Sequence, residues 1–314
     1  MNNIFEWELD LIVLLQNTLP WLRTIMQFFT TIGEPFVYIL VMLILIWCVD
    51  YRFGVKYATL ILCSSFINSF SKILIRAPRP YFIDDRIHVS HLEDGYGMPS
   101  GHAQNSTVAL ITLSNYKNMT RFRIAFIAVI ILIGLSRVYL GYHSPIQVLA
   151  GWIMGVCVIG IVYKFENPQG SSRLERIKTM SIKIKTLIIL LLWLVSMTYL
   201  IACVNDVQMK IDYASKISIY MGTLIGIQWG SKRLSTRINA IQLDHRMGKL
   251  LARCLVGFPL VFALIYCVKM AEKHITDMWV SGTLQFILMI GVGLWVSYGA
   301  IIVFDKLSIL KSED

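Results

Sequence analysis

Three short polar clusters interrupt an otherwise strongly apolar chain, and each carries groups suited to binding an anion. The clusters are Lys72 with Arg79-Pro80, then Pro99-Ser100-Gly101-His102, then Ser136-Arg137 with His143. A charge within hydrocarbon costs about 2.5–3.5 kcal/mol even on a lenient insertion scale. An arginine and a histidine six residues apart at the end of an apolar run therefore indicate a functional site at the membrane edge.

The residue types in these clusters match what binding and cleaving a phosphate requires. Lysine and arginine neutralise the non-bridging oxygens, and arginine can do so bidentately. A glycine at a helix start lets the anion approach backbone N–H groups at the positive end of the helix dipole. One neutral histidine can attack phosphorus, and a second can protonate the leaving oxygen. The three clusters together therefore predict a phosphate site.

The composition shows which kind of protein must position these clusters. Of the 314 residues, 56% are apolar and only 15% are charged, and the mean hydropathy is +0.63. These values indicate a polytopic α-helical membrane protein and exclude a soluble domain of this size. The net charge of +10 comes from basic residues between apolar runs, which is typical of cytoplasmic loops and does not require a nucleic-acid partner.

The order of apolar runs predicts an all-α helical bundle with about nine membrane spans and an amphipathic N-terminal helix. Residues 1–34 are expected to form interfacial helices, residues 35–164 a five-span catalytic core, 165–184 a basic cytoplasmic linker, and 185–314 a four-span C-terminal extension. The expected spans are 35–49, 55–75, 100–116, 122–142, 145–164, 185–204, 213–229, 249–268 and 280–304.

Two features of the C-terminal half have structural interpretations. Gly222, Gly226 and Gly230 are four residues apart and allow close helix approach within the bundle. The basic segment 232–249 is expected to be a cytoplasmic loop that touches anionic lipid.

The distribution of lysine and arginine predicts the orientation. The loops after spans one, three, five and seven, together with the C-terminus, carry most of the basic residues and should be cytoplasmic. The loop 76–101 and His143 then face away from the cytoplasm, so all three clusters lie on one extracytoplasmic surface. In a bacterial source this membrane would be the cell membrane.

The three clusters, taken together and in this order, resemble the motifs of the type 2 phosphatidic acid phosphatase superfamily. The resemblance implies that His143 is a nucleophile forming a phosphohistidine and that His102 is the general acid for the leaving alcohol. It implies that the phosphate is cradled by Lys72, Arg79, Ser100, the Gly101 N–H and Arg137. It also implies no metal and no cofactor, and three cations can balance a phosphate without Mg²⁺.

Gln147 departs from the common pattern, in which an aspartate four residues after the nucleophilic histidine orients its ring. The Gln147 carbonyl oxygen can accept the Nδ1–H bond of His143, but it brings no charge. In another system, an amide in place of such an aspartate costs about 10⁴ in rate through the wrong tautomer. Alternatively, Ser144 and Gln147 form a capping box. Both interpretations stay open at this point.

Three functions are compatible with these residues. The first is a membrane phosphatase acting on a lipid phosphate such as phosphatidic acid, sphingosine 1-phosphate or undecaprenyl pyrophosphate. The second is a glucose-6-phosphatase-like hydrolase of a soluble sugar phosphate, favoured by Gln147 and the nine-span count. The third is a non-catalytic lipid-phosphate binder or transporter, against which both histidines and all three cations argue. His88 and His91 also allow a metal site, although solvated residues of a loop covering the phosphate pocket explain them as well.

Overall fold

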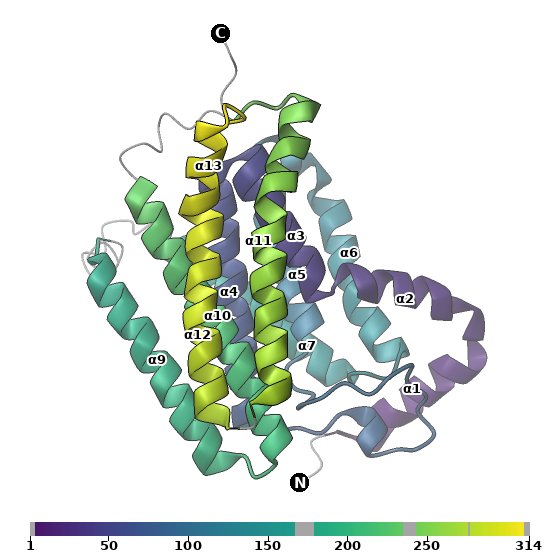
Figure 1. Ribbon diagram of the computed structural model, residues 1–314. Helices are drawn as coiled ribbons and strands as arrows, with labels where there is room; N and C mark the ends of the chain where they lie inside the picture. Colours follow the sequence, from purple (N-terminus) through teal and green to yellow (C-terminus); the bar gives the residue numbers. More distant parts are fainter. Residues whose placement is uncertain (1–3, 167–178, 235–242, 276, 311–314) are drawn as a thin grey trace. The chain divides into compact units, whose positions relative to one another are not determined.

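A computed structural model describes residues 4–166, 179–234, 243–275 and 277–310 (Figure 1). The fold is all-helical, with 82% helix and no strand among these residues, as the sequence predicts. Of the predicted linker 165–184, residues 167–178 lie outside the described residues, and so do residues 235–242 of the basic segment 232–249.

The chain divides into two compact units, which are described separately. Unit 1 consists of Met1–Tyr38 and Ile67–Lys178, and unit 2 of Ile39–Phe66 and Thr179–Asp314. Residues 39–66, which the sequence analysis assigns to the catalytic core, therefore group with the C-terminal half. All eight predicted site residues belong to unit 1.

Unit 1 is built around one central helix, α5, which packs against α6 and α7, while α1 and α2 pack against α6. Its elements are α1 (Glu6–Thr18), η1 (Pro20–Leu22), α2 (Arg23–Ile32), the start of α3 (Pro35–Ile44), the end of α4 (Tyr51–Ile75), η3 (Pro80–Phe82), α5 (Gly101–Ser114), η4 (Lys117–Phe122), α6 (Arg123–Tyr139) and α7 (Pro145–Glu166). Gly151 and Gly155 of α7 bring its backbone against the first turns of α5, because side chains there would collide with Ser100 and Thr107. This approach brings the second and third motifs together.

Unit 2 is organised around α10, which packs closely against α12 and also against α9. Its elements are the rest of α3 and α4, η2 (Leu45–Val49), α9 (Ile182–Cys203), α10 (Val207–Leu234), α11 (Met247–His274), α12 (Met278–Leu294), the π-helical η6 (Trp295–Gly299) and α13 (Ala300–Lys306). The glycine stripe of α10 lies against α12, with Gly226 facing Ile290 and Gly230 facing Ser297.

The described residues contain six helices long and apolar enough to span a membrane, or seven if one bent pair counts as a span. The six are Tyr51–Phe82, Lys117–Tyr139, Pro145–Lys164, Ile182–Cys203, Met247–Met270 and Met278–Lys306, and the bent pair is Pro20–Ile32 with Pro35–Val49, at 46°. The predicted count of nine is therefore not confirmed, and the interfacial placement of the N-terminal helices stays a prediction.

The remaining two predicted spans are helical, but they differ from the others in character. α5 has only 14 residues and buries Gln104, Ser106 and Thr107, while α10 buries Ser215, Ser218 and Thr223. These polar side chains pack against neighbouring helices and not against lipid, so these positions need not be apolar. Hydropathy alone therefore identifies the peripheral helices more readily than the central ones.

Candidate active site

Backbone hydrogen bonds join the three motifs in unit 1. The N–H of Ser100 donates to the carbonyl of Gln147 at 2.9 Å, which ties the start of α5 to the first turn of α7. The N–H of Gly97 donates to the carbonyl of Ala77 at 2.7 Å, which ties the loop before α5 to the end of α4. Residues far apart in sequence therefore meet at the helix ends.

Two buried arginines share one carboxylate at the centre of this region. Arg79 and Arg137 are 3% and 1% exposed, and Glu93 contacts both of them. One Glu93 oxygen lies 2.8 Å from Arg79 Nη1, and the other accepts a hydrogen bond from Arg137 Nη2. The carboxylate thus brings two guanidinium groups to one place. A tetrahedral oxyanion has the same requirement, because it also needs several hydrogen-bond donors from one side.

Each arginine is fixed further by the protein. Arg137 donates to Thr30 Oγ1 at 2.8 Å, and its guanidinium lies 4.2 Å above the ring centre of Tyr142. Its buried Nε–H has no acceptor among the described residues. Arg79 donates to the backbone carbonyls of Asp94, Gly95 and Tyr142. Arg137 therefore keeps a donor for a ligand, whereas Arg79 is largely satisfied by the loop.

The charge balance lowers the pKa of Glu93. Burial by itself would raise this pKa, but the positive charges of Arg137 and Arg79 outweigh burial and bring it to about 2. Because the folded-state pKa lies below the ordinary value of 4.5, the stabilisation is complete above about pH 4.5 and is lost as the pH falls through about 2.

We expect Glu93→Gln to remove this acid-sensitive part of the stability. The lowering of the Glu93 pKa corresponds to about 3 kcal/mol of folding free energy at neutral pH. The unfolding midpoint of the wild-type protein should exceed that of the variant at pH 7, and the difference should shrink between pH 4.5 and 2. Thermal unfolding in detergent across this range measures it, and an equal acid sensitivity of both proteins would contradict the assignment.

His143 is almost fully buried, and its ring is held by Gln147. Its Nδ1 lies 3.2 Å from Gln147 Oε1, and the same oxygen accepts from the Ser144 N–H at 3.3 Å. The amide Nε2 of Gln147 donates to the Pro78 carbonyl at 2.8 Å. Because a backbone N–H can only donate and a carbonyl can only accept, these two contacts fix which end of the amide faces His143.

This arrangement combines both interpretations of Gln147. Gln147 N also approaches Ser144 Oγ at 3.4 Å, so the reciprocal contacts of a capping box are present at the start of α7. The same Oε1 that closes the box faces His143 Nδ1. With Nδ1–H donated to Gln147, the lone pair resides on Nε2, which is the tautomer that a nucleophile needs.

Replacing Gln147 by leucine should therefore lower kcat by about 10–100-fold and change KM little, because side chains that orient a reactive ring typically act at this scale. Steady-state kinetics on detergent-solubilised protein measures both constants. A selective rise in KM would contradict a role in orienting His143. A matched replacement, Gln16→Leu, tests the general effect of losing a side-chain amide that bridges two segments, since Gln16 of α1 is half-buried and bonds the His88 and Tyr139 backbone carbonyls instead.

The electrostatic surroundings keep His143 neutral. Burial is the largest cause of its lowered pKa, and Arg79, Arg137 and then Lys72 add to the shift, which brings the pKa well below 6.5. Lys72, in the last turn of the α4 helix, is thus close enough to act on this ring. The His143 ring is therefore neutral at physiological pH.

His102 lies in the first turn of α5 and faces a second carboxylate. Its Nε2 is 3.5 Å from Glu34 Oε1, at the bend between α2 and α3. The Glu34 carboxylate therefore lies close enough to the His102 ring to orient it.

Ser100 and Gly101 form the N-terminal end of α5. Ser100 is fully buried and its Oγ accepts from the Ala103 N–H at 3.5 Å as the helix cap. A side chain at Gly101 would lie 3.1 Å from Asn68 Oδ1, and Asn68 itself donates to Gln104 Oε1 and the Pro99 carbonyl. The glycine therefore leaves room for the Asn68 side chain beside the first turn of α5.

The structure adds residues that the sequence analysis did not single out. Glu93 and Glu34 contact the predicted cations and His102, and Thr30 contacts Arg137. Glu8 of α1 is fully buried and accepts the Ile146 N–H at 2.9 Å, which fixes the start of α7. Of these residues, only Glu8 could have been noticed in the sequence, because it is an acidic residue next to the apolar face of a predicted helix.

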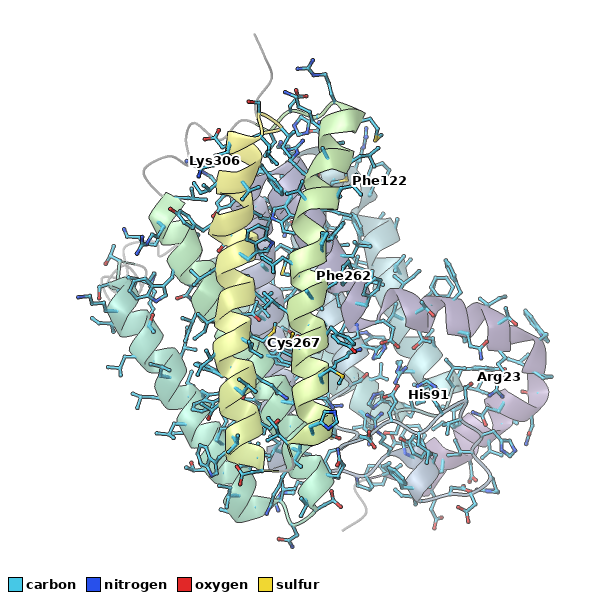
Figure 2. All side chains as sticks on the ribbon, viewed as in Figure 1. Arg23, His91, Phe122, Phe262, Cys267 and Lys306 are labelled. Carbon is cyan, nitrogen blue, oxygen red and sulfur yellow. The ribbon has the colours of Figure 1, made fainter. Side chains whose placement is uncertain are left out.

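The two loop histidines have other contacts. His91, labelled in Figure 2, places its Nδ1 3.0 Å from the Tyr142 hydroxyl, and the backbone of His88 bonds the side chain of Gln16. Among the described residues, no group of three or more His, Cys, Asp or Glu side chains is arranged to hold a metal.

Comparisons with known proteins match two parts of the chain. Residues 53–171 match the family model of the PAP2 superfamily, and residues 218–312 match the transmembrane extension of PAP2 superfamily phosphatases. No solved structure matches the chain with significance.

Several characterised proteins are similar over about half of the chain. Undecaprenyl-diphosphatase of Sulfolobus acidocaldarius is 25% identical over 162 residues, which are 51% of this chain and 78% of that protein. Glucose-6-phosphatase 3 of Bos taurus is 29% identical over 165 residues, 45% of this chain and 48% of that protein. Phosphatidylglycerophosphatase B of Bacillus subtilis is 28% identical over 163 residues, 47% and 76% respectively. The match thus spans less than half of the glucose-6-phosphatase.

The two family models describe one superfamily and together cover more than half of the 314 residues. The membership predicted from the three motifs is confirmed. The chain belongs to the PAP2 superfamily, as an integral membrane member that carries the superfamily's transmembrane extension.

Proposed function

We propose that the protein is a membrane phosphatase that hydrolyses the phosphate monoester or pyrophosphate of a lipid. The observation that carries this proposal is the convergence of Arg79, Arg137, Lys72 and two histidines at the ends of apolar helices. The distribution of basic residues supports an extracytoplasmic site and a cytoplasmic C-terminus.

The proposed reaction proceeds by double displacement. His143 Nε2 attacks phosphorus, the P–N bond forms and the bond to the leaving oxygen breaks, while His102 supplies a proton to that oxygen. Water then attacks the phosphohistidine, His102 takes its proton, and phosphate leaves as the P–N bond breaks. Arg79, Arg137, Lys72, Ser100 and the Gly101 N–H stabilise the charge on the non-bridging oxygens.

Glu93 has to be accommodated in this scheme. Its carboxylate contacts the same two arginines that are assigned to the phosphate, and a bound phosphate would repel it. Substrate binding is therefore expected to shift Glu93 or to use the remaining donors, of which the Arg137 Nε–H is one.

An apolar cavity beside the site supports a lipid substrate. The cavity has a volume of about 280 Å³ and lies between α1, α2, α6 and α7. Its lining includes Val138, Pro145 and Val148, which directly follow Arg137, Ser144 and Gln147 in the sequence. A hydrocarbon chain could occupy this space while its phosphate reaches the arginines, and a sugar would gain nothing from it.

A soluble sugar phosphate is the second candidate. Gln147 and the similarity to glucose-6-phosphatase 3 favour it. Phosphate release in detergent should be measured with phosphatidic acid, sphingosine 1-phosphate, undecaprenyl pyrophosphate and glucose 6-phosphate. The proposal expects a lipid to give the highest kcat/KM. A preference for glucose 6-phosphate would establish the second candidate, and phosphate binding without any release would indicate a binder or transporter.

A further inference from the structure

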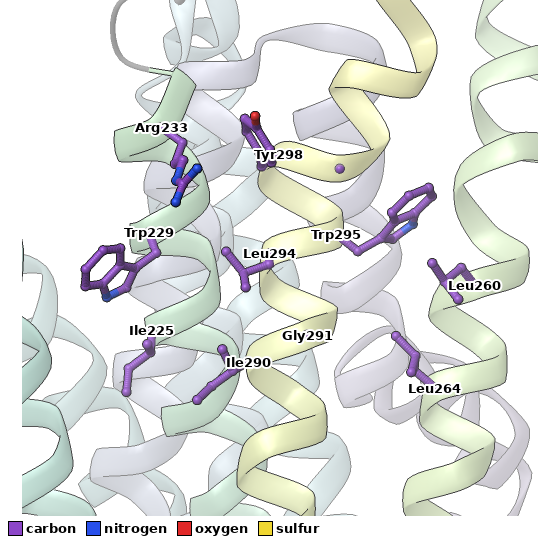
Figure 3. A pocket seen from close by; sticks show the side chains of 11 residues that line it. Ile225, Trp229, Arg233, Leu260, Leu264, Ile290, Gly291, Leu294, Trp295 and Tyr298 are labelled. Carbon is purple, nitrogen blue, oxygen red and sulfur yellow. The ribbon is translucent and has the colours of Figure 1, made fainter.

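Unit 2 contains a second cavity that the proposed chemistry does not use. It has a volume of about 670 Å³ and lies between α10, α11, α12 and η6 (Figure 3). This volume is in the range of sites that bind small organic molecules, about 300–1,000 Å³. All of its lining residues belong to unit 2, so the cavity is distinct from the phosphate site of unit 1.

The cavity is apolar at one end and polar at the other. α10 and α12 run in the same direction, since Gly226 faces Ile290 and Gly230 faces Tyr298 further along both helices. Ile225 and Ile290 therefore line the apolar end, whereas Arg233 and Tyr298 lie toward the other end (Figure 3). Arg233 is the single charged residue in the lining.

The polar groups of the lining differ in whether the protein already uses them. The indole N–H of Trp229 donates to Thr186 Oγ1 at 2.8 Å, and that of Trp295 donates to the Gly257 carbonyl at 3.1 Å. Both indoles therefore offer only ring surface to the cavity. Within the described part of the chain, the Arg233 guanidinium and the Tyr298 hydroxyl have no such partner.

The backbone also departs from regular helix at this place. Trp295, Tyr298 and Gly299 belong to the π-helical η6, and π-helical turns are rare and occur frequently at functional sites. Gly291, one turn earlier, faces open space, because a side chain added there would meet nothing within 4 Å. The cavity thus results from the π-helical backbone of η6 and from the glycine at position 291.

We propose that this cavity binds one membrane lipid with an anionic phosphate headgroup. Arg233 and the Tyr298 hydroxyl bind the phosphate, and the acyl chain follows Ile225, Ile290 and Leu264 between the helices. Charge complementarity selects this occupant, since an apolar cavity lined by a hydroxyl donor and by one cation, for which the described residues offer no ion-pair partner, matches an anionic amphiphile. The proposal depends on the membrane location and not on the proposed catalysis.

Lipid binding to the full-length protein tests the proposal. The delipidated protein in detergent is titrated with phosphatidylglycerol and with phosphatidylcholine of identical chains, and bound lipids are counted by native mass spectrometry. The variants are Arg233→Gln, which removes the cation, and Gly291→Phe, which fills the open space. Their matched controls are Lys232→Gln, an adjacent exposed cation outside the lining, and Gly248→Phe, a glycine that also faces open space.

The wild-type protein should bind one phosphatidylglycerol about fivefold more tightly than phosphatidylcholine, which is the effect of one basic side chain near a headgroup. Arg233→Gln should abolish this preference, Gly291→Phe should remove the bound lipid, and both controls should behave as wild type. Absence of a preference in the wild-type protein, or an equal loss in Lys232→Gln, would overturn the proposal. Phosphatase activity is not part of this readout, so failure of the proposed function would leave the result interpretable.

Discussion

The His143→Ala variant should have a kcat at least about 10⁴-fold below that of the wild-type protein. Loss of a nucleophile in covalent catalysis typically costs this much or more, because the covalent intermediate cannot form without it and the remaining groups cannot replace it. Phosphate release from the best lipid substrate in detergent measures the effect. His88→Ala is the matched control, since His88 is an exposed loop histidine whose side chain makes none of the contacts of the site.

Folding can be separated from chemistry in this variant. The side chain of His143 has one hydrogen-bond partner among the described residues, Gln147 Oε1, and the backbone bond of His143 to the Arg137 carbonyl remains in the variant, so the loss of hydrogen bonding should be small. Parental activity in a folded His143→Ala protein would rule out the proposed nucleophile.

The Arg137→Ala variant should lose both activity and stability. Arginines that stabilise a transferring phosphoryl group contribute about 10³–10⁵ in rate. The same side chain pairs with Glu93 in a buried position, and removing one partner of a buried ion pair costs about 3–5 kcal/mol. Thermal unfolding and steady-state kinetics on the same preparation measure the two effects.

The variant Arg137→Lys separates these contributions. A lysine keeps a positive charge beside Glu93, which also stays paired with Arg79, so a large part of the stability should be retained, whereas the activity should stay low because lysine lacks the planar fork of donors. Full activity in Arg137→Lys would show that the guanidinium of Arg137 has no role in the reaction beyond its charge.

The residues of the candidate site could be selected from the sequence because their types are unusual in an apolar chain, while the chemistry assigned to them stays a prediction. Lys72, Arg79, His102, Arg137 and His143 are costly near a membrane, and their positions at the ends of apolar runs restricted them to one surface. The structure brings the motifs containing them together through α5 and α7. The superfamily membership followed from the same spacings.

The acidic partners of these cations were not predictable. Glu93 and Glu34 lie in a loop and at a helix bend, where no periodicity relates them to the residues they contact. The position of Glu93 depends on how the segment 76–100 folds over the arginines, and that of Glu34 depends on how α2 and α3 pack against the start of α5. The same holds for Gln147, whose amide orientation depends on the distant Pro78 carbonyl.

The predicted number of spans is not confirmed for a different reason. α5 and α10 are central helices whose polar side chains pack against other helices, so their composition resembles that of a soluble protein. Length and hydropathy, which measure suitability for contact with lipid, do not identify such helices.

Trapping the covalent intermediate tests the central claim most directly. The protein is mixed with a ³²P-labelled lipid phosphate, quenched with base within the first turnover, digested and mapped by mass spectrometry. The proposed mechanism predicts a phosphoryl group on His143, absent from His143→Ala and present in His88→Ala. Turnover with no labelled protein, or with the label on another residue, would contradict it.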